Sequence, residues 1–321
     1  MKNIVSSSIF RIVYGVLYAV SLLPLGVLYV LSDCACPLLY YVIRYRRRVV
    51  RRNLEQSFPE MTHAGIVRTE RKFYRWLCDY FVETVKLMSV SAEEIKRRMT
   101  FKGTELIDEA TRRGQSSALF LGHYCNWEWV STLPLHIDIG DCLAGELYHP
   151  LRNVVMDKVF LRLRQRFHTV CINKNEALRT IVRCRRSGMP VVIGYISDQK
   201  PKWQNIHLWV DFLNHKDTPV FTGTEKIVKM TDQVFFYADM RRPRRGSYEC
   251  EFRMIERRTA GIPDFELTER YMRELEKSIR REPAYYLWTH DRWSRTRDEF
   301  DRRFYVRDGK VYERKYAKNN E

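Results

Sequence analysis

The sequence predicts an α/β fold with a central mixed, largely parallel sheet flanked by helices. From residue 101 onward, short β-prone runs alternate with segments whose apolar residues recur at helical spacing. The expected strands are 117–121, 142–147, 169–172, 190–196, 233–239 and 248–255, and the expected helices are 106–113, 127–136, 154–166, 176–186, 224–230 and 267–281. This alternation is typical of parallel strands joined by helices.

The N-terminal segment is apolar and long enough to reach across a bilayer. No residue from Ile12 to Ser32 is charged, and the apolar character resumes shortly afterwards up to Ile43. A spanning helix needs roughly 20 such residues, and no clear cleavage site marks a signal peptide. Pro24 and Pro37 interrupt the stretch, so a single span, a helical hairpin and an interfacial helix are all compatible with it.

The chain carries a formal net charge of +17, which calls for a polyanionic partner. A dense basic group directly follows the apolar segment: Arg44, Arg46, Arg47, Arg48, Arg51 and Arg52. Basic residues next to a membrane segment stay on the cytoplasmic side and attract anionic headgroups. We therefore expect an anionic membrane as the partner rather than nucleic acid, for which the sequence has no recognised binding motif.

Length and composition indicate a folded protein. The 321 residues are 45% hydrophobic and 30% charged, which supplies enough apolar material for a substantial core. Residues 46–98 have apolar positions at helical spacing as well. We expect a membrane anchor at 1–43 and one globular domain at 44–321, in which 44–100 form a helical lead-in and 101–321 the α/β core.

Metal and cofactor sites are not expected. The eight cysteines are scattered, with no CxxC pair and no matching Cys/His cluster, so the sequence predicts neither a zinc site nor a disulfide framework. There is no Gly-rich phosphate loop either.

One segment contains the candidate catalytic residues. A predicted strand at 117–121 is followed by a turn at Gly122, then by His123 and, five residues later, by Glu128. On a continuous helix these two side chains would point about 140° apart and would not meet. If His123 lies in the turn and Asn126 caps the next helix, Glu128 folds back to the imidazole. The carboxylate then fixes the tautomer and leaves the other ring nitrogen to act as a general base.

The run from Gly122 to Glu128 resembles the catalytic block of the late lipid A acyltransferases, the lauroyl and myristoyl transferase family of the lysophospholipid acyltransferase superfamily. Further blocks follow in that family's order: Arg52-Asn53-Leu54, Phe58-Pro59-Glu60, Tyr148 to Asn153, Arg164 to Phe167, Gly188, Ser197-Asp198-Gln199, Phe212 to Thr224 and Tyr286 to Trp293. The resemblance covers nearly the whole chain and rests on this shared order.

The resemblance implies an enzyme that moves a fatty acyl chain from an acyl-carrier-protein thioester to a hydroxyl of a lipid A precursor. It implies the bacterial inner membrane, with the catalytic domain on the cytoplasmic side, and we expect a monomer. Catalysis is expected of His123 and Glu128, and substrate binding of Arg164, Arg166, Asn126, Asp198 and Gln199. Arg164 best matches the family's arginine for the oxyanion or phosphate.

The chain departs from the usual family pattern at four positions. Cys125 and Asn214 stand where glycine is usual, and Asp291 and Ser294 stand where basic residues are common. These changes bear on acceptor identity and acyl length more than on the chemistry.

Direct transfer to the acceptor, without a covalent acyl-enzyme, is the expected mechanism. Several alternatives stay open. Cys125, two residues from His123, offers a covalent nucleophile. The acceptor could instead be another glycolipid, an aminolipid or a lysophospholipid, and the donor a CoA thioester. A non-catalytic basic protein tethered to the membrane is the alternative from another class.

Two basic regions are candidates for receiving an acidic carrier protein or a phosphorylated sugar. Arg241, Arg242, Arg244 and Arg245 lie in an expected turn between two strands, and Arg292, Arg295, Arg297, Arg302 and Arg303 follow near the C-terminus. A solvated hairpin tip is the alternative interpretation of the first region.

Overall fold

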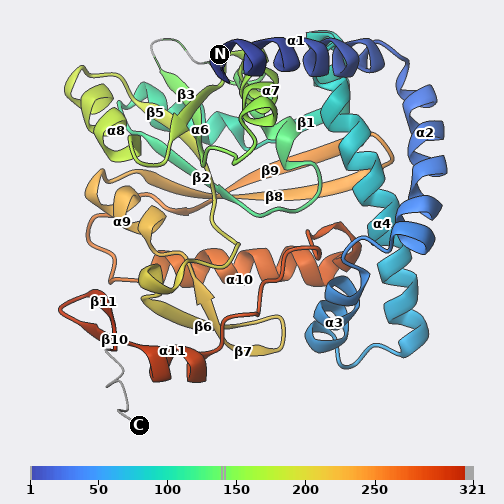
Figure 1. Cartoon of the computed structure of the whole chain (residues 1–321). Helices are drawn as coiled ribbons and strands as arrows, with labels where there is room; N and C mark the ends of the chain where they lie inside the picture. The colour runs from blue at the N-terminus through green and yellow to red at the C-terminus, as the bar shows by residue number, and fades with distance from the viewer. Residues whose placement is uncertain (1, 139, 141, 315–321) are drawn as a thin grey trace.

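The computed structural model describes residues 2–138, 140 and 142–314, and its centre is a seven-stranded sheet with the order β1-β9-β8-β2-β5-β3-β4 (Figure 1). The strands are β1 (Met99–Lys102), β2 (Ser117–Leu121), β3 (Leu143–Tyr148), β4 (Val170–Asn173), β5 (Val191–Ile196), β8 (Val234–Arg244) and β9 (Ser247–Glu256). Every neighbouring pair is parallel except β8 with β9, which forms an antiparallel hairpin. The predicted mixed, largely parallel sheet is confirmed.

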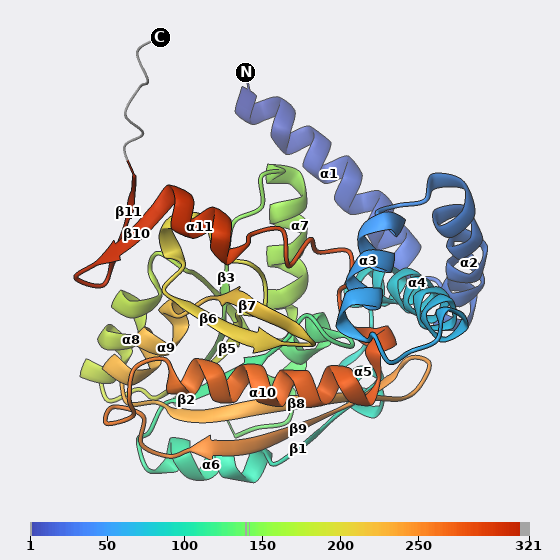
Figure 2. The same ribbon diagram turned by 90° about the horizontal axis from the view of Figure 1, so that it is seen from below.

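Helices flank this sheet, and α10 (Glu266–Arg281) packs along β8 (Figure 2). The other α-helices after the N-terminal segment are α3 (Arg47–Ser57), α4 (His63–Lys86), α5 (Ala92–Arg98), α6 (Thr104–Arg112), α7 (Val154–Arg164), α8 (Ala177–Arg186), α9 (Gly223–Met230) and α11 (Arg297–Arg303). Two small hairpins lie outside the sheet: β6 (Leu208–Phe212) with β7 (His215–Val220), and β10 (Phe304–Arg307) with β11 (Lys310–Glu313). Neither hairpin is predicted from the sequence, because these short strands do not have a clear apolar alternation.

The predicted helix 127–136 is a 3-10 helix instead, η2 (Trp127–Leu135). Pro134 lies inside it, and the hydroxyls of Ser131 and Thr132 donate to carbonyls three residues earlier. Such local bonds compete with α-helical geometry. Asn126 caps its first turn as expected, accepting a hydrogen bond from the Trp129 backbone N–H at 3.3 Å.

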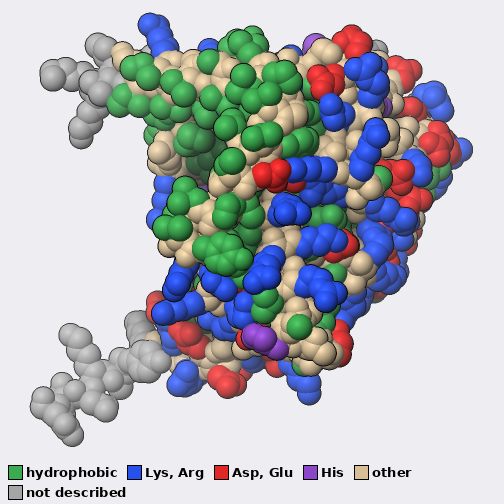
Figure 3. All heavy atoms as spheres, turned by 90° about the vertical axis from the view of Figure 1, so that its right-hand side faces the viewer, with side chains coloured by type: hydrophobic (Ala, Val, Ile, Leu, Met, Phe, Trp, Pro, Cys, Tyr) green, Lys and Arg blue, Asp and Glu red, His purple; other side chains and the backbone are tan. Residues whose placement is uncertain are grey.

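The apolar N-terminal segment forms α1 (Lys2–Ser21), α2 (Leu25–Pro37) and the π-helical turn η1 (Leu38–Ile43). Pro24 separates α1 from α2, whereas Pro37 lies within a helical run that ends at Arg44. Leu25–Ile43 has a mean hydropathy of 1.6 with only 17% of it buried, so it is long and apolar enough to cross a membrane. Figure 3 shows the side of the molecule on which α2 lies, and hydrophobic side chains gather over the upper part of this side. The exposed large apolar residues of the N-terminal segment, which we call the apolar face, include Ile9, Ile12, Val16, Tyr18, Leu22, Leu23, Val27, Val30, Leu31, Leu38, Tyr41, Val42 and Ile43.

Polar bonds fix α2 to the rest of the molecule. Ser32 Oγ donates to Asp79 Oδ1 of α4 at 2.7 Å, and Tyr29 OH donates to Glu83 Oε1 at 2.9 Å. Arg242 and Arg245 pair with the same Asp79 at 2.7 and 2.6 Å. The prediction that residues 241–245 form an exposed turn is therefore wrong for residues 241–244. These residues belong to β8, which ends at Arg244, and the Arg242 side chain is buried in an ion pair with Asp79.

Candidate active site

The centre of the site lies where β2 and β5 end. These strands are parallel neighbours, and their last residues, Leu121 and Ile196, pair with each other. His123 follows the first strand by two residues and Asp198 follows the second by two. The carboxyl ends of parallel strands meet at one edge of a sheet, so both side chains emerge side by side.

Asp198 holds the His123 imidazole. Its Oδ1 lies 2.6 Å from Nδ1, and its Oδ2 accepts the His123 backbone N–H at 3.1 Å. Burial acts to raise the pKa of Asp198, but the attraction and hydrogen bonds of His123 outweigh it and leave this pKa below its ordinary value. An ionised carboxylate makes Nδ1 the protonated nitrogen and leaves a lone pair on Nε2. Gln199 Nε2 lies 3.3 Å from that second nitrogen.

The predicted hydrogen bond between Glu128 and His123 is wrong. Among the described residues, the ring nitrogens face Asp198 and Gln199. Glu128 instead forms a two-pronged pair with Arg164 of α7, whose Nε and Nη2 donate to its carboxylate at 2.7 and 2.6 Å. The 3-10 turn after the Asn126 cap directs this carboxylate to α7 rather than back to the imidazole.

Trp127 joins the two pairs of residues. Its ring lies edge-on to the His123 imidazole, with 5.1 Å between centroids, and its Nε1 donates to Glu128 Oε1 at 3.1 Å. Tyr80 of α4 packs on the same indole at 4.3 Å and donates to Glu128 at 3.4 Å. The His123–Asp198 and Glu128–Arg164 pairs therefore belong to one continuous cluster. Trp127 is not among the site residues expected from the sequence, although it lies inside the family block from Gly122 to Glu128.

Two residues expected to bind substrate have other partners. Asn126 is fully buried and, besides capping η2, donates to Glu83 Oε2 at 2.9 Å. Arg166 donates through Nη1 to the carbonyls of Leu87, at 3.1 Å, and Val90, which follow α4. These contacts explain both residues through packing and do not support the predicted role in binding.

Comparison with known families decides the class of the protein. The model of a family described as bacterial lipid A biosynthesis acyltransferase matches residues 3–295 of the chain. The chain belongs to this family. The resemblance noted in the sequence is thereby confirmed, and the protein is an acyltransferase of lipid A biosynthesis with an acyl donor and a lipid acceptor. Membership and the apolar Leu25–Ile43 helix together indicate association with a membrane. No curated protein sequence matches the chain.

A second carboxylate of the acyltransferase lies beside Arg164. Glu146 of β3 is 3.3 Å from Arg164 Nε, so two carboxylates share one guanidinium. Burial raises the pKa of Glu146 to about 7, the attraction of Arg164 opposes this rise, and repulsion from Glu128 adds to it. The folded protein therefore keeps a proton on Glu146 at pH values where the unfolded chain, with an ordinary glutamate pKa, has lost it.

Replacing Glu146 with Gln should stabilise the acyltransferase at pH 8 and change it little at pH 5. A glutamate whose pKa is raised in the folded state contributes its full stability at pH values below its pKa in the unfolded chain. That contribution is lost as the pH rises through the folded-state pKa of about 7. We expect a gain of about 1–2 kcal/mol in the free energy of unfolding at pH 8, measured by urea unfolding of the detergent-solubilised chain. An equal effect at both pH values would contradict this assignment.

The segment after α10 packs against the site of the acyltransferase. Leu287 N donates to the His123 carbonyl at 3.0 Å, and His290 Nε2 accepts the Lys200 backbone N–H at 3.2 Å. Arg292, expected at the surface as part of a docking region, is 1% exposed, and its three guanidinium nitrogens have no hydrogen-bond partner among the described residues. Burial lowers the pKa of Arg292, whereas the attraction of Tyr286 and Asp198 opposes this effect. No cluster of three or more metal-binding side chains occurs in the part of the chain that the structure describes.

Proposed function

We propose that the protein transfers a fatty acyl chain from an acyl-carrier-protein thioester to a hydroxyl group of a lipid A precursor, with His123 as general base. The observation that carries this proposal is the Asp198 carboxylate on Nδ1, because it leaves Nε2 as the basic nitrogen. The imidazole is 19% exposed, whereas Asp198 is 1% exposed, so the base is reachable from outside and its orienting group is not.

The reaction proceeds in one displacement. His123 Nε2 takes the proton of the acceptor hydroxyl while its oxygen attacks the thioester carbonyl carbon. The tetrahedral intermediate then collapses, its carbon–sulfur bond breaks, and the carrier thiolate recovers the proton from the imidazolium. Gln199, near Nε2, donates a hydrogen bond that the acceptor hydroxyl replaces on binding.

Arg164 is the proposed donor to the oxyanion. Its Nε and Nη2 are taken by Glu128, and Nη1 has no hydrogen-bond partner among the residues described. A guanidinium fixed by a bidentate carboxylate and left with a free Nη1 amino group is preorganised for charge that develops in the transition state. Glu128 thus acts by holding Arg164, while Trp127 keeps both beside the imidazole.

The proposed setting is the cytoplasmic face of a bacterial inner membrane. The arginines that follow Ile43 favour the cytoplasmic side, and the chain as a whole has a charge of +17 that suits an acidic carrier protein. The attraction of the acidic carrier protein to the basic chain is electrostatic, so high salt should weaken the binding of the carrier protein.

The test is an acyl-transfer assay with the purified full chain in detergent. Acyl-carrier-protein and CoA thioesters of equal chain length are offered with a lipid A precursor, a lysophospholipid or an aminolipid, and products are identified by mass spectrometry. An added ester-linked acyl chain on the lipid A precursor, formed from the carrier thioester, is the expected result. Transfer only to another lipid, or only to an amine, would overturn the proposed acceptor.

Replacing Cys125 with Ala should leave the transfer rate within about twofold of the wild type, because a buried thiol is a poor nucleophile. Cys125 is fully buried, and burial raises its pKa well above the ordinary thiol value. Its φ of 53° also explains why glycine is usual here. Cys184→Ala on α8 is the matched control for a buried cysteine. A large loss specific to Cys125→Ala, with an unchanged melting temperature, would instead favour a covalent acyl-enzyme.

A further inference from the structure

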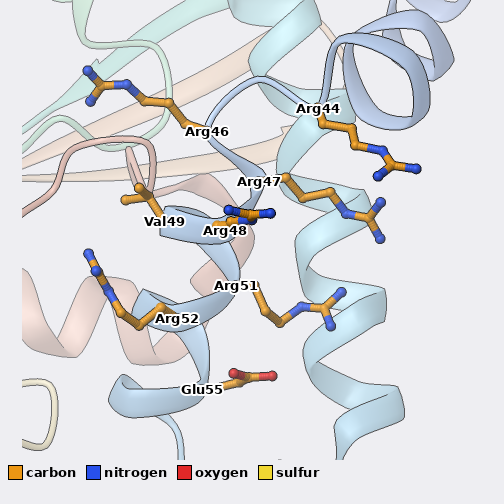
Figure 4. Close-up of a pocket in the computed structure, with 8 residues that line it drawn as sticks. All are labelled: Arg44, Arg46, Arg47, Arg48, Val49, Arg51, Arg52 and Glu55. Atoms are coloured by element: carbon orange, nitrogen blue, oxygen red, sulfur yellow. The ribbon is translucent and has the colours of Figure 1, made fainter.

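A surface pocket lies where the apolar segment ends. It has a volume of about 650 Å³ and is lined by Arg44, Arg46, Arg47, Arg48, Val49, Arg51, Arg52 and Glu55, which we call the arginine pocket (Figure 4). Arg44 directly follows Ile43, the last residue of the apolar helical run. A helix that enters lipid through the apolar face therefore brings this pocket to the depth of the headgroups.

The positive charge of the arginine pocket exceeds what the protein itself neutralises. Buried Glu70 takes Arg47, at 2.8 Å, and Arg51, while Asp291 takes Arg52. Arg48 has no ion pair or hydrogen bond among the described residues. Arg44 has no ion pair among them either, and its Nε donates to the Tyr41 carbonyl at 3.2 Å.

Figure 4 shows how the side chains are arranged around α3. Arg46 and Arg52 point to one side of the helix, Arg44, Arg47 and Arg51 point to the side of α4, and Arg48 lies between the two groups. Arg48, which has no ion pair in the described part of the chain, and Arg44, which bonds to one backbone carbonyl, keep further N–H groups available, and guanidinium groups donate several charge-assisted hydrogen bonds to phosphate oxygens. The pocket thus has the chemistry of a phosphate site.

A short segment connects the arginine pocket to the catalytic centre. Arg46 Nη1 donates to the Thr289 carbonyl at 2.9 Å, and Asn53 Nδ2 donates to the His290 carbonyl at 3.0 Å. Two residues before Thr289, the Leu287 N–H is bonded to His123, and two residues of chain span at most about 7 Å. The arginine pocket and His123 therefore both bond to one short segment, Leu287 to Thr289.

We propose that the arginine pocket binds a phosphate group of the lipid acceptor and so places the acceptor hydroxyl at His123. That the bound lipid is the acceptor rests on the proposed function. Binding of a lipid phosphate to the pocket can be tested separately, without turnover. It assigns to α3 a role in recognising the substrate, whereas the residues of the cluster around His123 carry out the chemistry.

The first experiment measures binding of dioctanoyl phosphatidic acid to the full chain in maltoside detergent. The double variant Arg44→Gln/Arg48→Gln should bind at least about tenfold more weakly, since two charge-assisted donors are removed. The matched control Arg185→Gln/Arg186→Gln on α8 removes the same charge from exposed residues far along the chain and should bind like the wild type. Equal losses in both double variants would reduce the effect to net charge and overturn the site.

Two ligand controls separate the possible sources of phosphate. Dioctanoylglycerol, which lacks the phosphate, should not compete, and inorganic phosphate should bind far more weakly than the lipid. Inorganic phosphate that binds as tightly as phosphatidic acid would show a site for the free anion and overturn the lipid assignment. Melting temperatures of the variants check that each chain is folded.

The second experiment compares a phosphorylated acceptor with the same acceptor after phosphatase treatment. Removing the phosphate should raise KM for the wild type about tenfold, with kcat nearly unchanged, and should raise it little for Arg44→Gln/Arg48→Gln, which has already lost the contact. Independent, additive effects would overturn the inference while leaving the proposed acyl transfer intact. Absence of transfer in every chain would overturn the proposed function alone, because phosphatidic acid binding still decides whether the site exists.

Discussion

Replacing His123 with Ala is expected to lower kcat by about 10⁴-fold, the upper end of what a positioned general base contributes. The His123 imidazole has a buried carboxylate on Nδ1 and a partly exposed ring whose Nε2 can accept a proton. We therefore expect no neighbouring group to replace it as the base that takes the proton of the acceptor hydroxyl. The rate of acyl transfer under single-turnover conditions measures this loss directly. Binding of phosphatidic acid to the arginine pocket should stay at the wild-type level.

Control variants distinguish the loss of the base from loss of the fold. His63→Ala removes an exposed histidine at the start of α4 and should retain full activity. His123→Ala should melt at nearly the wild-type temperature, because the ring is partly exposed and its backbone bonds to Asp198 and Leu287 persist. An active His123→Ala enzyme would remove the general base from the mechanism.

Replacing Asp198 with Asn should lower kcat on the order of 10³-fold while His123 stays in place. Asp198 accepts from two N–H groups, the Nδ1–H and the backbone N–H of His123. An asparagine has one acceptor oxygen, and the backbone N–H cannot reverse its role, so the oxygen goes to the backbone and the NH₂ group faces Nδ1. Nδ1 must then accept, and Nε2 carries the hydrogen instead of the lone pair.

This tautomer inversion has a readout that simple unfolding lacks. ¹⁵N chemical shifts of the labelled imidazole should show hydrogen on Nδ1 in the wild type and on Nε2 in Asp198→Asn. The KM for the acceptor should change little, because the loss is confined to the chemical step. A low kcat with an unchanged tautomer would mean that Asp198 acts through packing instead.

The sequence predicts six of the seven strands of the central sheet, most clearly those that are short apolar runs, and misses β1 (Met99–Lys102), whose four residues include a threonine and a lysine. β2, for example, is buried along its whole length between parallel neighbours, and Ser117 at its start is its one polar residue. The edge of the sheet where the site forms follows from the same reasoning, since His123 and Asp198 both come directly after strands.

The partners within the site could not be predicted in the same way. Glu128 is five residues from His123 in sequence, but its carboxylate is taken by Arg164 on another element, and Asp198 occupies the place expected for it. A 3-10 turn instead of an α-helix is enough to redirect a side chain, and composition does not distinguish the two. The burial of Arg292 could not be predicted either. It is one of many arginines in the C-terminal region, and nothing in the sequence distinguishes a buried arginine from an exposed one.

The bonds between α2 and α4 have a mechanical consequence. Ser32 and Tyr29 are bonded to Asp79 and Glu83 of α4, and Tyr80 of the same helix contacts Glu128, so these bonds set the position of the apolar helix relative to the catalytic cluster. The height of the imidazole above the hydrocarbon then depends on where Leu25–Ile43 comes to rest in the membrane, so a bilayer of different thickness would lift or lower the reaction centre relative to the lipid acceptor.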